Sequence, residues 1–446
     1  MHILEIVKFY LEVNKNVFKY SNQLGRPILD FLYLIFDNLF YFLLFIAIII
    51  STIYFVMCIY TFINRKKQDE TEFIAEKAPF VSVQIPTYNE LVAIRCAKRC
   101  LEFDYPKEKF EIIIGDDSNN PSVSEKIDSF AKEHEKVIVT RRGNNIGYKA
   151  GNLNYMLQKS KGEILVLFDS DFTPERDFLK RIVAPFINDS NISGVQARWK
   201  SIDRNRNLVS LLGSTIIDVF HHICLPFINK RANLSFLCGS AEAVRKKDLL
   251  DLGGWEPGSL TEDIEFSLKL LKNGKKIVYL SGLECFGEVP YKPKDLYKQQ
   301  MRWAYGVISS FKKHFITLFF RNKNIGVKEK FYISFFCSGY LFSFLLLMLF
   351  TTGILSFITH PPGPIDLSRF FGELLRNIAL TSGIIITSVY TMVKTKNIRK
   401  LASIVAASFS IGLVVTYYVN LGIFKVLLNK SMEWYMLSKK GNLEET

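Results

Sequence analysis

Residues 164–171 read Ile-Leu-Val-Leu-Phe-Asp-Ser-Asp, an apolar run followed at once by two carboxylates. A short apolar run of this kind predicts a buried strand, so Asp169 and Asp171 stand on the loop at its carboxyl end. Two carboxylates in this spacing can share one divalent cation, and Mg²⁺ and Mn²⁺ prefer oxygen ligands and also bind phosphates. Asp-x-Asp is common by chance, but its position after a buried strand predicts a site for Mg²⁺ or Mn²⁺.

Other short, β-branched apolar runs surround this one along the chain: Val81–Ile85, Ile112–Ile114 and Val137–Val139. Stretches suited to helices or loops separate them, and this alternation predicts a mostly parallel sheet in an α/β domain over residues 75–300. Ligands of such sheets bind in the crevice outside the carboxyl ends of the strands. The polar clusters of this chain fall at those ends.

Two polar clusters follow the first two runs. The segment Gln84–Glu90 contains Tyr88 and closes the first strand, where its Pro-Thr-Tyr-Asn turn can equally be a plain strand terminator. Asp116 and Asp117 follow the second strand, and adjacent carboxylates repel each other unless a donor or a cation binds them. Ligand contact is the favoured interpretation, and the alternative is a helix N-cap that accepts amide protons.

Three further clusters suit the chemistry of a phosphorylated sugar. Lys149, within Gly147–Asn154, stands at a predicted helix start, where an ammonium can neutralise phosphate. Thr261–Asp263 puts an Asp before Ile264–Leu271, and that Asp can deprotonate an acceptor hydroxyl or serve as an N-cap. Gln299–Trp303 sets an Arg beside a Trp, which suits phosphate pairing and stacking on a sugar face, or anchoring at a membrane surface.

The composition is that of a lipid-contacting protein, because 49% of the 446 residues are hydrophobic and 38 are Phe. Lys and Arg outnumber Asp and Glu by 57 to 43, which favours anionic lipid headgroups or phosphorylated substrates as partners. No nucleic acid is expected as a partner, since the chain lacks a nucleic-acid motif and a basic low-complexity tail. The seven Cys have no zinc spacing and are expected to be free, buried thiols.

Long uncharged runs predict transmembrane helices over 39–63, 331–358 and 377–393, because about 20 apolar residues span a bilayer. Basic residues at 65–67 follow the first run directly. Such residues mark the cytoplasmic side, so the α/β domain is expected in the cytoplasm. No cleavable signal peptide is expected.

Three more segments are expected at the membrane surface. Residues 1–32 mix charged and apolar residues as an amphipathic helix does, and residues 294–320 interleave Lys and Arg with aromatic residues as an interfacial helix does. Residues 401–424 carry no charge and are long enough to span, but basic residues flank both ends, which disfavours a span. We therefore expect 401–427 to be interfacial or re-entrant, with a transmembrane helix as the alternative.

In this order and spacing the clusters resemble the family-two glycosyltransferases of the cellulose synthase superfamily. That family's pattern is Asp, Asp-x-Asp, Thr-Glu-Asp and Gln-x-x-Arg-Trp, and all four are present within about residues 75–305. Phe236–Ser240 is similar to the family's Phe-Cys-Gly-Ser segment, while Val195–Lys200 and Glu288–Pro290 look most like plant cellulose-synthase-like mannan and glucan synthases. The resemblance implies a GT-A-type nucleotide-sugar-binding domain with a mostly parallel sheet, inserted between transmembrane helices.

The resemblance also implies roles for the site residues. Asp263 would be the general base, with Glu262 as the second catalytic carboxylate. The nucleotide-sugar donor would be bound by Tyr88, Glu90, Asp116, Asp117, Lys149, Asp169, Gln299 and Arg302. The acceptor sugar would be bound by Trp303, Cys238, Gly239 and Ser240. The cation would fall to Asp171 together with Asp169.

The segment Tyr435–Gly441 is similar to the family's gating loop, whose pattern is Phe-x-Val-Thr-x-Lys-Gly. Tyr435, Ser438 and Lys440 stand for its aromatic, hydroxyl and basic residues, and the first two depart from the family's residue types. A gating loop must meet the active site, so the resemblance implies that the tail over 431–446 is cytoplasmic.

The function expected from all these features is inverting transfer of a hexose from UDP-glucose or GDP-mannose to a growing β-linked polysaccharide, which the chain extrudes. The alternative is a non-processive transferase that makes a glycolipid on a ceramide- or diacylglycerol-type acceptor, which the small number of spans favours. A scaffold with a degenerate transferase domain would lack acidic motifs, and none is missing. The expected location is the plasma membrane of a prokaryote, in contact with membrane lipids.

Overall fold

The structure is a computed structural model that describes residues 26–64, 71–322, 325–360 and 367–441. Most of the expected amphipathic segment over 1–32 and the last five residues of the tail lie outside these ranges. The chain divides into two compact units. The smaller consists of the residues up to Phe55 and of Leu341–Ile385, and the larger of Val56–Tyr340 and the residues from Ile386 onward.

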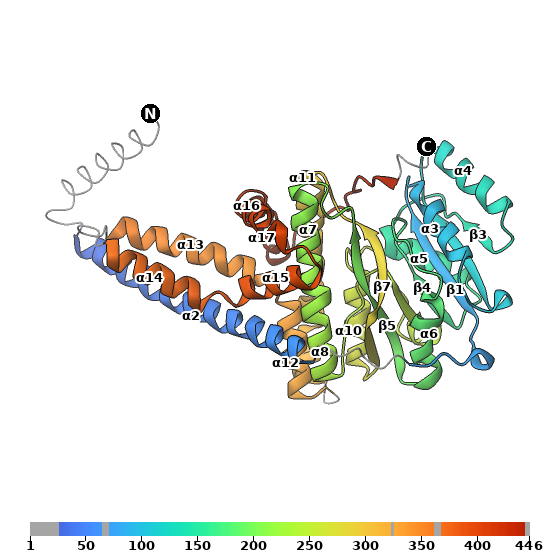
Figure 1. The fold of residues 1–446 in the computed structure, drawn as a ribbon, viewed down its shortest axis with the longest axis horizontal. Helices are drawn as coiled ribbons and strands as arrows, with labels where there is room; N and C mark the ends of the chain where they lie inside the picture. Colours follow the sequence, from blue (N-terminus) through green and yellow to red (C-terminus); the bar gives the residue numbers. More distant parts are fainter. Residues whose placement is uncertain (1–25, 65–70, 323–324, 361–366, 442–446) are drawn as a thin grey trace. The chain divides into compact units, whose positions relative to one another are not determined.

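The larger unit contains a seven-stranded sheet in the order β3-β2-β1-β4-β6-β5-β7 (Figure 1). Its strands are β1 (Val81–Thr87), β2 (Phe110–Asp116), β3 (Val137–Thr140), β4 (Ile164–Leu167), β5 (Ile192–Ile202), β6 (Glu242–Arg245) and β7 (Lys276–Glu288). All pairs are parallel except those of β6, which is antiparallel to β4 and to β5. The four expected strands and the mostly parallel sheet are therefore confirmed.

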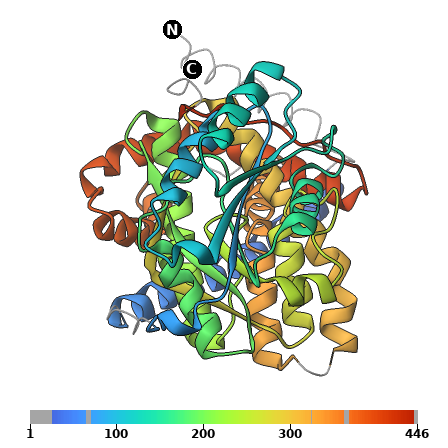
Figure 2. The same ribbon diagram turned by 90° about the vertical axis from the view of Figure 1, so that its right-hand side faces the viewer.

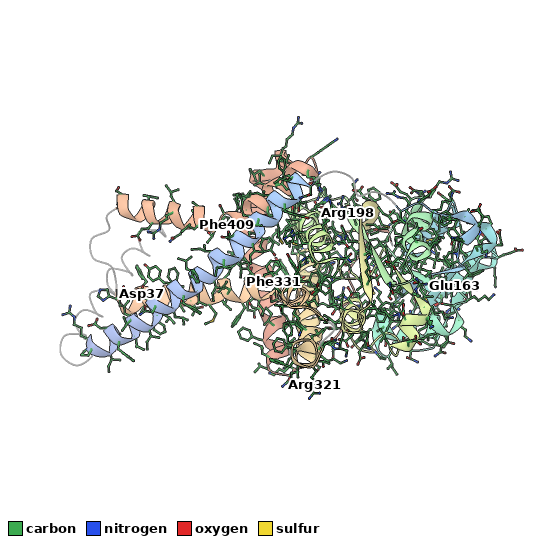
Figure 3. All side chains as sticks on the ribbon, turned by 90° about the horizontal axis from the view of Figure 1, so that it is seen from below. Asp37, Glu163, Arg198, Arg321, Phe331 and Phe409 are labelled. Carbon is green, nitrogen blue, oxygen red and sulfur yellow. The ribbon has the colours of Figure 1, made fainter. Side chains whose placement is uncertain are left out.

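Helices cover both faces of this sheet (Figure 2). They are α3 (Val92–Leu101), α4 (Pro121–Lys132), α5 (Tyr148–Lys159), α6 (Phe178–Asn188), α7 (Leu208–Val219), α8 (Leu225–Ala232), α9 (Lys246–Asp251), α10 (Glu262–Lys272) and α11 (Pro293–Ile316), with short turns η1 (Ala75–Lys77) and η2 (Lys107–Lys109). Every residue of β1 and β2 is buried, and the packed side chains between sheet and helices are visible in Figure 3. Cys96 and Cys100 face this core from α3, and all seven thiols are free.

The elements α7, η3 (Phe220–Cys224) and α8 run end to end beside the sheet (Figure 1). The central element η3 is a single π-helical turn. Together, over Leu208–Ala232, they are apolar enough to cross a membrane, but 67% of their most apolar window is buried within the protein. This segment was not expected from the sequence, and its burial makes it part of the α/β body.

The helix α11 covers most of the segment expected at 294–320, and a second π-helical turn, η4 (Thr317–Arg321), completes it. Its interfacial position stays a prediction. Gly422 lies in α17 (Ile411–Leu427), which packs against α11. A Cβ atom at Gly422 would stand 2.7 Å from the carbonyl oxygen of Met301, so the two helix backbones approach closely. Glycine is needed for that approach.

Three helices in the described residues are long and apolar enough to cross a membrane, or up to five if each of two bent pairs counts as one span. Besides Leu208–Ala232 they are α2 (Arg26–Ile63), which contains the expected 39–63, and α13 (Leu341–Thr359). The run 331–358 was expected as one helix, but it is divided at residues 338–340 between α12 (Val327–Cys337) and α13.

The other expected helices are interrupted as well. The run 377–393 breaks at Thr381 and Ser382, between α14 (Leu367–Leu380) and α15 (Gly383–Lys394). After η5 (Ile398–Lys400), the segment 401–427 is bent by 50° between α16 (Leu401–Phe409) and α17. The segment 401–427 is therefore not one straight helix, and its expected interfacial or re-entrant course, with a transmembrane helix as the alternative, stays a prediction.

Candidate active site

A solvent-open cleft lies at the carboxyl ends of the parallel strands. Thr87 of β1 pairs with Asp116 of β2, so the loops that follow these strands start level with each other. The expected site residues that line the cleft are Tyr88, Glu90, Asp117, Lys149, Asp169, Asp171, Cys238, Gly239, Glu262, Asp263, Gln299, Arg302, Trp303, Tyr435 and Ser438. Folding thus brings together motifs that are up to 350 residues apart in the sequence, from Tyr88 to Ser438.

Asp117, and not Asp116, lines the cleft. The Asp116 side chain is fully buried and accepts hydrogen bonds from Ser124 Oγ (2.6 Å) and Arg141 Nε (2.8 Å). Asp117 forms a two-pronged ion pair with Arg142, with Nε–Oδ1 and Nη2–Oδ2 distances of 2.9 and 2.6 Å. Burial raises the pKa of Asp117 although Arg142 opposes the shift. The helix N-cap considered for this motif falls to Asn120 instead.

Ser240 and Lys440 do not line the cleft either. Ser240 is buried beneath it, where its hydroxyl accepts a hydrogen bond from the backbone N–H of Asp169 (2.9 Å). Lys440 points to Asp203, with an Nζ–Oδ2 distance of 3.1 Å. The neighbouring Lys439 enters the cleft in its place. Ser240 therefore supports the Asp169 loop from below.

Lys149 joins two of the acidic motifs. It lies in the first turn of α5, which begins after Gly147 in the left-handed conformation (φ +72°). Its Nζ is 2.8 Å from Asp169 Oδ1 and 2.9 Å from Glu262 Oε1. Burial opposes the ammonium charge, but these carboxylates outweigh burial and raise the pKa of Lys149. The same contact lowers the pKa of Asp169 despite its burial.

Asp171 contacts a different lysine. Lys439 Nζ is 2.8 Å from Asp171 Oδ1, 3.0 Å from Glu90 Oε2 and 2.7 Å from Ser170 Oγ. Asp171 Oδ2 accepts a hydrogen bond from the backbone N–H of Glu288 (3.1 Å). Both carboxylates of Asp-Ser-Asp are thus paired with lysines, one from α5 and one from the tail.

Asp263 occupies the first turn of α10, where it is 8% exposed. Burial, and then the charge of Glu262, raise the pKa of Asp263 to about 7. Thr261 precedes the helix but makes no side-chain cap hydrogen bond. A Cβ atom placed on Gly239 would lie 3.5 Å from Asp263 Cγ and 3.4 Å from Lys149 Nζ. Asp263 and Lys149 therefore lie on the same side of Gly239, where a side chain at that position would project.

The helix α11 contributes Gln299, Arg302 and Trp303 to the cleft. Arg302 Nη1 donates a hydrogen bond to the carbonyl of Leu260 (3.2 Å), which ties α11 to the loop before Asp263. Gln299 is 8% exposed, and its Oε1 has no hydrogen-bond partner within the part of the chain that the structure describes. Buried polar atoms are usually satisfied, so an unpaired acceptor here suits a ligand.

Trp199 lines the cleft and was not expected as a site residue. It follows the buried part of β5, and its ring centroid is 6.3 Å from that of Trp303. Its ring also packs edge-on against Phe172 at 5.2 Å, and the ring of His221 of η3 stacks on the indole at 5.2 Å and 22°. The Nε1–H donates to the carbonyl of Ser240 (2.8 Å). The only sequence signal was its place in the Val195–Lys200 motif.

Aromatic side chains also gather around Tyr88 in the cleft. Trp434 of the tail has its ring centroid 5.9 Å from that of Tyr88 and 6.4 Å from that of Tyr148, which it meets nearly parallel. Neither Trp434 nor Tyr148 was expected as a site residue. Flat rings at such a position can stack on a base or a sugar.

The cleft has the donor chemistry that a hard divalent cation needs. Asp169 and Asp171 offer carboxylate oxygens at the end of β4, and each already attracts a lysine ammonium. Within the described ranges no three His, Cys, Asp or Glu residues form a complete metal cage. Mg²⁺ and Mn²⁺ in nucleotide sites commonly use one or two carboxylates plus phosphate oxygens, so two carboxylates fit such an ion.

The comparisons with known proteins agree with this geometry. A family model described as glycosyl transferase family group 2 matches residues 164–435. The chain is 30% identical over 275 residues to the probable glucomannan 4-beta-mannosyltransferase 1 of Arabidopsis thaliana, covering 60% of this chain and 49% of that protein. It is 28% identical over 265 residues to the probable glucomannan 4-beta-mannosyltransferase 7 of Oryza sativa subsp. japonica, covering 57% and 45%. The chain thus spans about half the length of these curated relatives.

Among solved structures, the fold is similar to that of a mannosyltransferase, PcManGT from Pyrobaculum calidifontis, in complex with GDP-Man and Mn²⁺. The TM-score is 0.59 at 18% identity, covering 87% of this chain and 100% of that chain. Together the comparisons confirm the expected GT-A-type fold and the resemblance to cellulose-synthase-like mannan and glucan synthases. The curated relatives named here are plant proteins and give the expected prokaryotic location no support.

Proposed function

The chain belongs to glycosyl transferase family group 2 and is a glycosyltransferase, and we propose that it transfers mannose from GDP-mannose to a growing β-linked polysaccharide with inversion. The buried Asp263 carboxyl carries this proposal, because it lines the cleft on the same side of Gly239 as the ammonium of Lys149. The names of the curated relatives and of the similar solved structure support mannose as the sugar and GDP-mannose as the donor.

Asp263 acts as the general base. A single displacement at the anomeric carbon needs one base for the acceptor hydroxyl and no nucleophile from the enzyme. A carboxyl with a pKa of about 7 is well matched to that task near neutral pH, since it can take a proton and release it again. Glu262 contributes by holding Lys149 through their 2.9 Å ion pair and by raising the pKa of Asp263.

Lys149 and Arg302 stabilise the departing nucleoside diphosphate. Both line the cleft with Asp169 and Asp171, and their cationic groups suit the charge that develops on the pyrophosphate. A Mg²⁺ or Mn²⁺ ion held by Asp171 and Asp169 would neutralise part of that charge. Tyr88 and Asp117 bind the base, with Glu90 and Gln299 as further donor contacts.

The acceptor sugar stacks on Trp303, with Cys238 and Gly239 beside it. An indole ring binds the apolar face of a sugar without fixing the sugar's hydroxyl pattern strongly. Trp199, whose ring centroid is 6.3 Å from that of Trp303, extends this aromatic wall, so a polymer can rest on both rings. This extended wall favours a polysaccharide over a lipid-linked single sugar as the acceptor.

We assign the catalytic unit to the cytoplasmic face of a membrane, with the polymer leaving through the apolar helices during processive extension. The basic residues after residue 63 and the tail inside the cleft support this orientation. The 50° bend between α16 and α17 supports an interfacial or re-entrant course for 401–427.

The test uses the full chain in lipid nanodiscs with Mn²⁺, offered GDP-mannose or UDP-glucose together with mannohexaose. Mannose is expected to be added, and the product should be degraded by β-mannanase and not by β-glucanase. Asp263→Asn should abolish transfer, while Asp251→Asn, an exposed carboxylate outside the cleft, should not.

Use of UDP-glucose in preference to GDP-mannose would overturn the donor assignment. If a labelled glycolipid is the sole product, the protein is a non-processive glycolipid-forming transferase and not a polysaccharide synthase. Turnover of Asp263→Asn within a few-fold of the unmodified chain would sink the assignment of the base.

A further inference from the structure

The tail enters the cleft as an extended segment that is held mainly by polar contacts. Residues 430–440 form neither helix nor strand. Tyr435 Oη and the backbone N–H of Ser438 donate hydrogen bonds to the two oxygens of Asp295, at 3.1 and 3.2 Å. The backbone N–H groups of Lys440 and Gly441 donate to the two oxygens of Glu288, at 2.7 and 2.9 Å. Two carboxylates of the body thus fix the tail on either side of residue 439.

Between these two anchors, Lys439 inserts its ammonium among acidic groups of the donor site. Its side chain is only 15% exposed, and Nζ contacts Asp171 Oδ1 at 2.8 Å and Glu90 Oε2 at 3.0 Å. Ser170 Oγ is a third partner at 2.7 Å. The contacts satisfy all three donors of the ammonium. Lys439 therefore occupies a complete cation site built from residues on the loops after β1 and β4.

A divalent cation that binds Asp171 through Oδ1 needs the oxygen that Lys439 uses. Oδ1 is the oxygen that the Lys439 ammonium contacts, while Oδ2 accepts a hydrogen bond from the N–H of Glu288, so a cation on Oδ1 must take the place of the ammonium. Mg²⁺ ligand distances are about 2.0–2.1 Å, shorter than the present 2.8 Å ammonium contact. Two positive ions so close together repel strongly in a buried site. The cation and the Lys439 ammonium consequently exclude each other at this carboxylate.

We propose that Lys439 is an internal competitor of the divalent cation, so that the tail and the cation with its donor occupy Asp171 in turn. When the cation binds Asp171, the Lys439 side chain would leave the donor site. When the cation is released, the side chain would return to it. The proposal rests on the proposed function in one respect, namely that Asp171 is the cation ligand.

The adjacent lysine provides a matched control. Lys440 has the same charge and lies one residue further along the chain, but its ammonium pairs with Asp203 outside the cleft. The Lys440 side chain is 42% exposed, against 15% for Lys439. A general effect of tail charge on the cation would appear in both positions, whereas direct competition would appear only at Lys439.

The first experiment measures Mn²⁺ binding to the full chain in nanodiscs by electron paramagnetic resonance, without any donor. Lys439→Met should bind Mn²⁺ about tenfold more tightly than the unmodified chain, within the 5- to 150-fold range usual for coupled sites. Lys439→Arg keeps the charge and should bind as the unmodified chain does, and so should Lys440→Met. Equal affinity of Lys439→Met and the unmodified chain would overturn the proposal.

The same titration on Asp171→Asn separates this proposal from the proposed function. If Asp171→Asn loses Mn²⁺ binding while Lys439→Met binds Mn²⁺ with the affinity of the unmodified chain, competition is refuted. The assignment of Asp171 as the cation ligand then still holds. Unchanged Mn²⁺ binding in Asp171→Asn would refute the assignment of Asp171 as the cation ligand. It would also refute competition between Lys439 and the cation at that residue.

A second measurement needs no change at Lys439. Trypsin cleaves after lysine, and the buried side chain of Lys439 should be protected from it. Mn²⁺ should accelerate cleavage at Lys439 in the unmodified chain in proportion to the fraction of sites that it occupies, and should not do so in Asp171→Asn. Cleavage that is indifferent to Mn²⁺ while Mn²⁺ is bound would show that lysine and cation coexist, against the proposal.

Discussion

The α/β body and the C-terminal tail both contribute lysines to the cleft, but they hold them in different ways. Lys149 belongs to α5, which packs on the wholly buried strands β1 and β2. Lys439 belongs to a segment without regular structure, whose neighbours bind Asp295 and Glu288 through hydrogen bonds. Apolar burial fixes the first lysine, and exchangeable polar contacts fix the second.

This difference teaches which parts of the site can move. A hydrogen bond contributes a net of about 0.5–1.5 kcal/mol, because water can replace either partner. The tail can therefore leave the cleft without disturbing the core, whereas α5 cannot. We expect changes in the body to remove chemistry and changes in the tail to alter access to it.

The largest effect is expected at Asp263. Asp263→Asn removes the proton acceptor while keeping the shape of the side chain, and a general base contributes about 10²–10⁴ in rate. Transfer should fall by that factor, and binding of GDP-mannose, measured by calorimetry, should stay nearly the same. If a tail variant lost as much transfer rate as Asp263→Asn does, the proposed difference in role between the α/β body and the tail would be contradicted.

A smaller effect is expected at the tail anchor Asp295. The amide of Asp295→Asn keeps one acceptor oxygen for Tyr435 and loses the one for the N–H of Ser438. Hydrogen bonds to charged groups contribute about 1.5–3 kcal/mol, so tryptic cleavage of the tail should accelerate at least about tenfold. Tyr435→Phe also removes one bond but keeps the charge of Asp295 for the N–H of Ser438, so it should have a smaller effect. An unchanged cleavage rate would mean that the tail is held elsewhere.

Substitutions in the aromatic wall of Trp303 and Trp199 should have effects about as large as that of Asp295→Asn, or smaller. Aromatic contacts contribute about 0.5–1.5 kcal/mol, so Trp303→Ala should raise the KM for mannohexaose about 2- to 13-fold. Hydrolysis of GDP-mannose in the absence of acceptor should change less. Trp199→Ala should act mainly on long acceptors, because only an acceptor that extends beyond Trp303 would rest on both rings. If Trp303→Ala lowered transfer and hydrolysis equally, Trp303 would not be an acceptor contact and would serve only as a membrane anchor.

The smallest expected effect is on pH dependence. Asp263 must be ionised to accept a proton, so with a pKa of about 7 the value of kcat/KM should rise with pH through about 7. The charge of Glu262 raises that pKa, hence Glu262→Gln should lower it and move the acidic limb to lower pH by about one unit or less. A shift of the limb to higher pH would contradict the assigned cause.

The sequence predicted the central strands because their apolar runs are short and uninterrupted. It missed β5, β6 and β7. The partly exposed ends of β5 and β7 carry charges such as Lys200 and Glu284 among apolar residues, and β6 is a four-residue strand, Glu242–Arg245, with a charge at each end. The runs 331–358 and 377–393 looked continuous by hydropathy, but hydropathy is insensitive to the breaks at Gly339 and at Ser382. The hydropathy of a segment indicates whether it is buried, but it does not detect such local turns.

For the site, motif order predicted most of the residues that line the cleft. It failed where one position decides which way a side chain points. Asp116 and Asp117 are adjacent, and only Asp117 lines the cleft, just as Lys439 lines it and Lys440 does not. Nothing in the residue types distinguishes the members of these pairs, since their directions follow from the backbone course after β2 and along the tail.

The close approach of α17 to α11 restricts sequence variation far from the reacting groups. At Gly422 a single added methyl group would meet the carbonyl of Met301 at 2.7 Å, two residues before Trp303. Any substitution there must push apart the helix that carries Trp303 and the helix that leads into the tail. In saturation mutagenesis, position 422 should therefore tolerate glycine alone, while exposed neighbours such as Leu427 should accept most apolar residues.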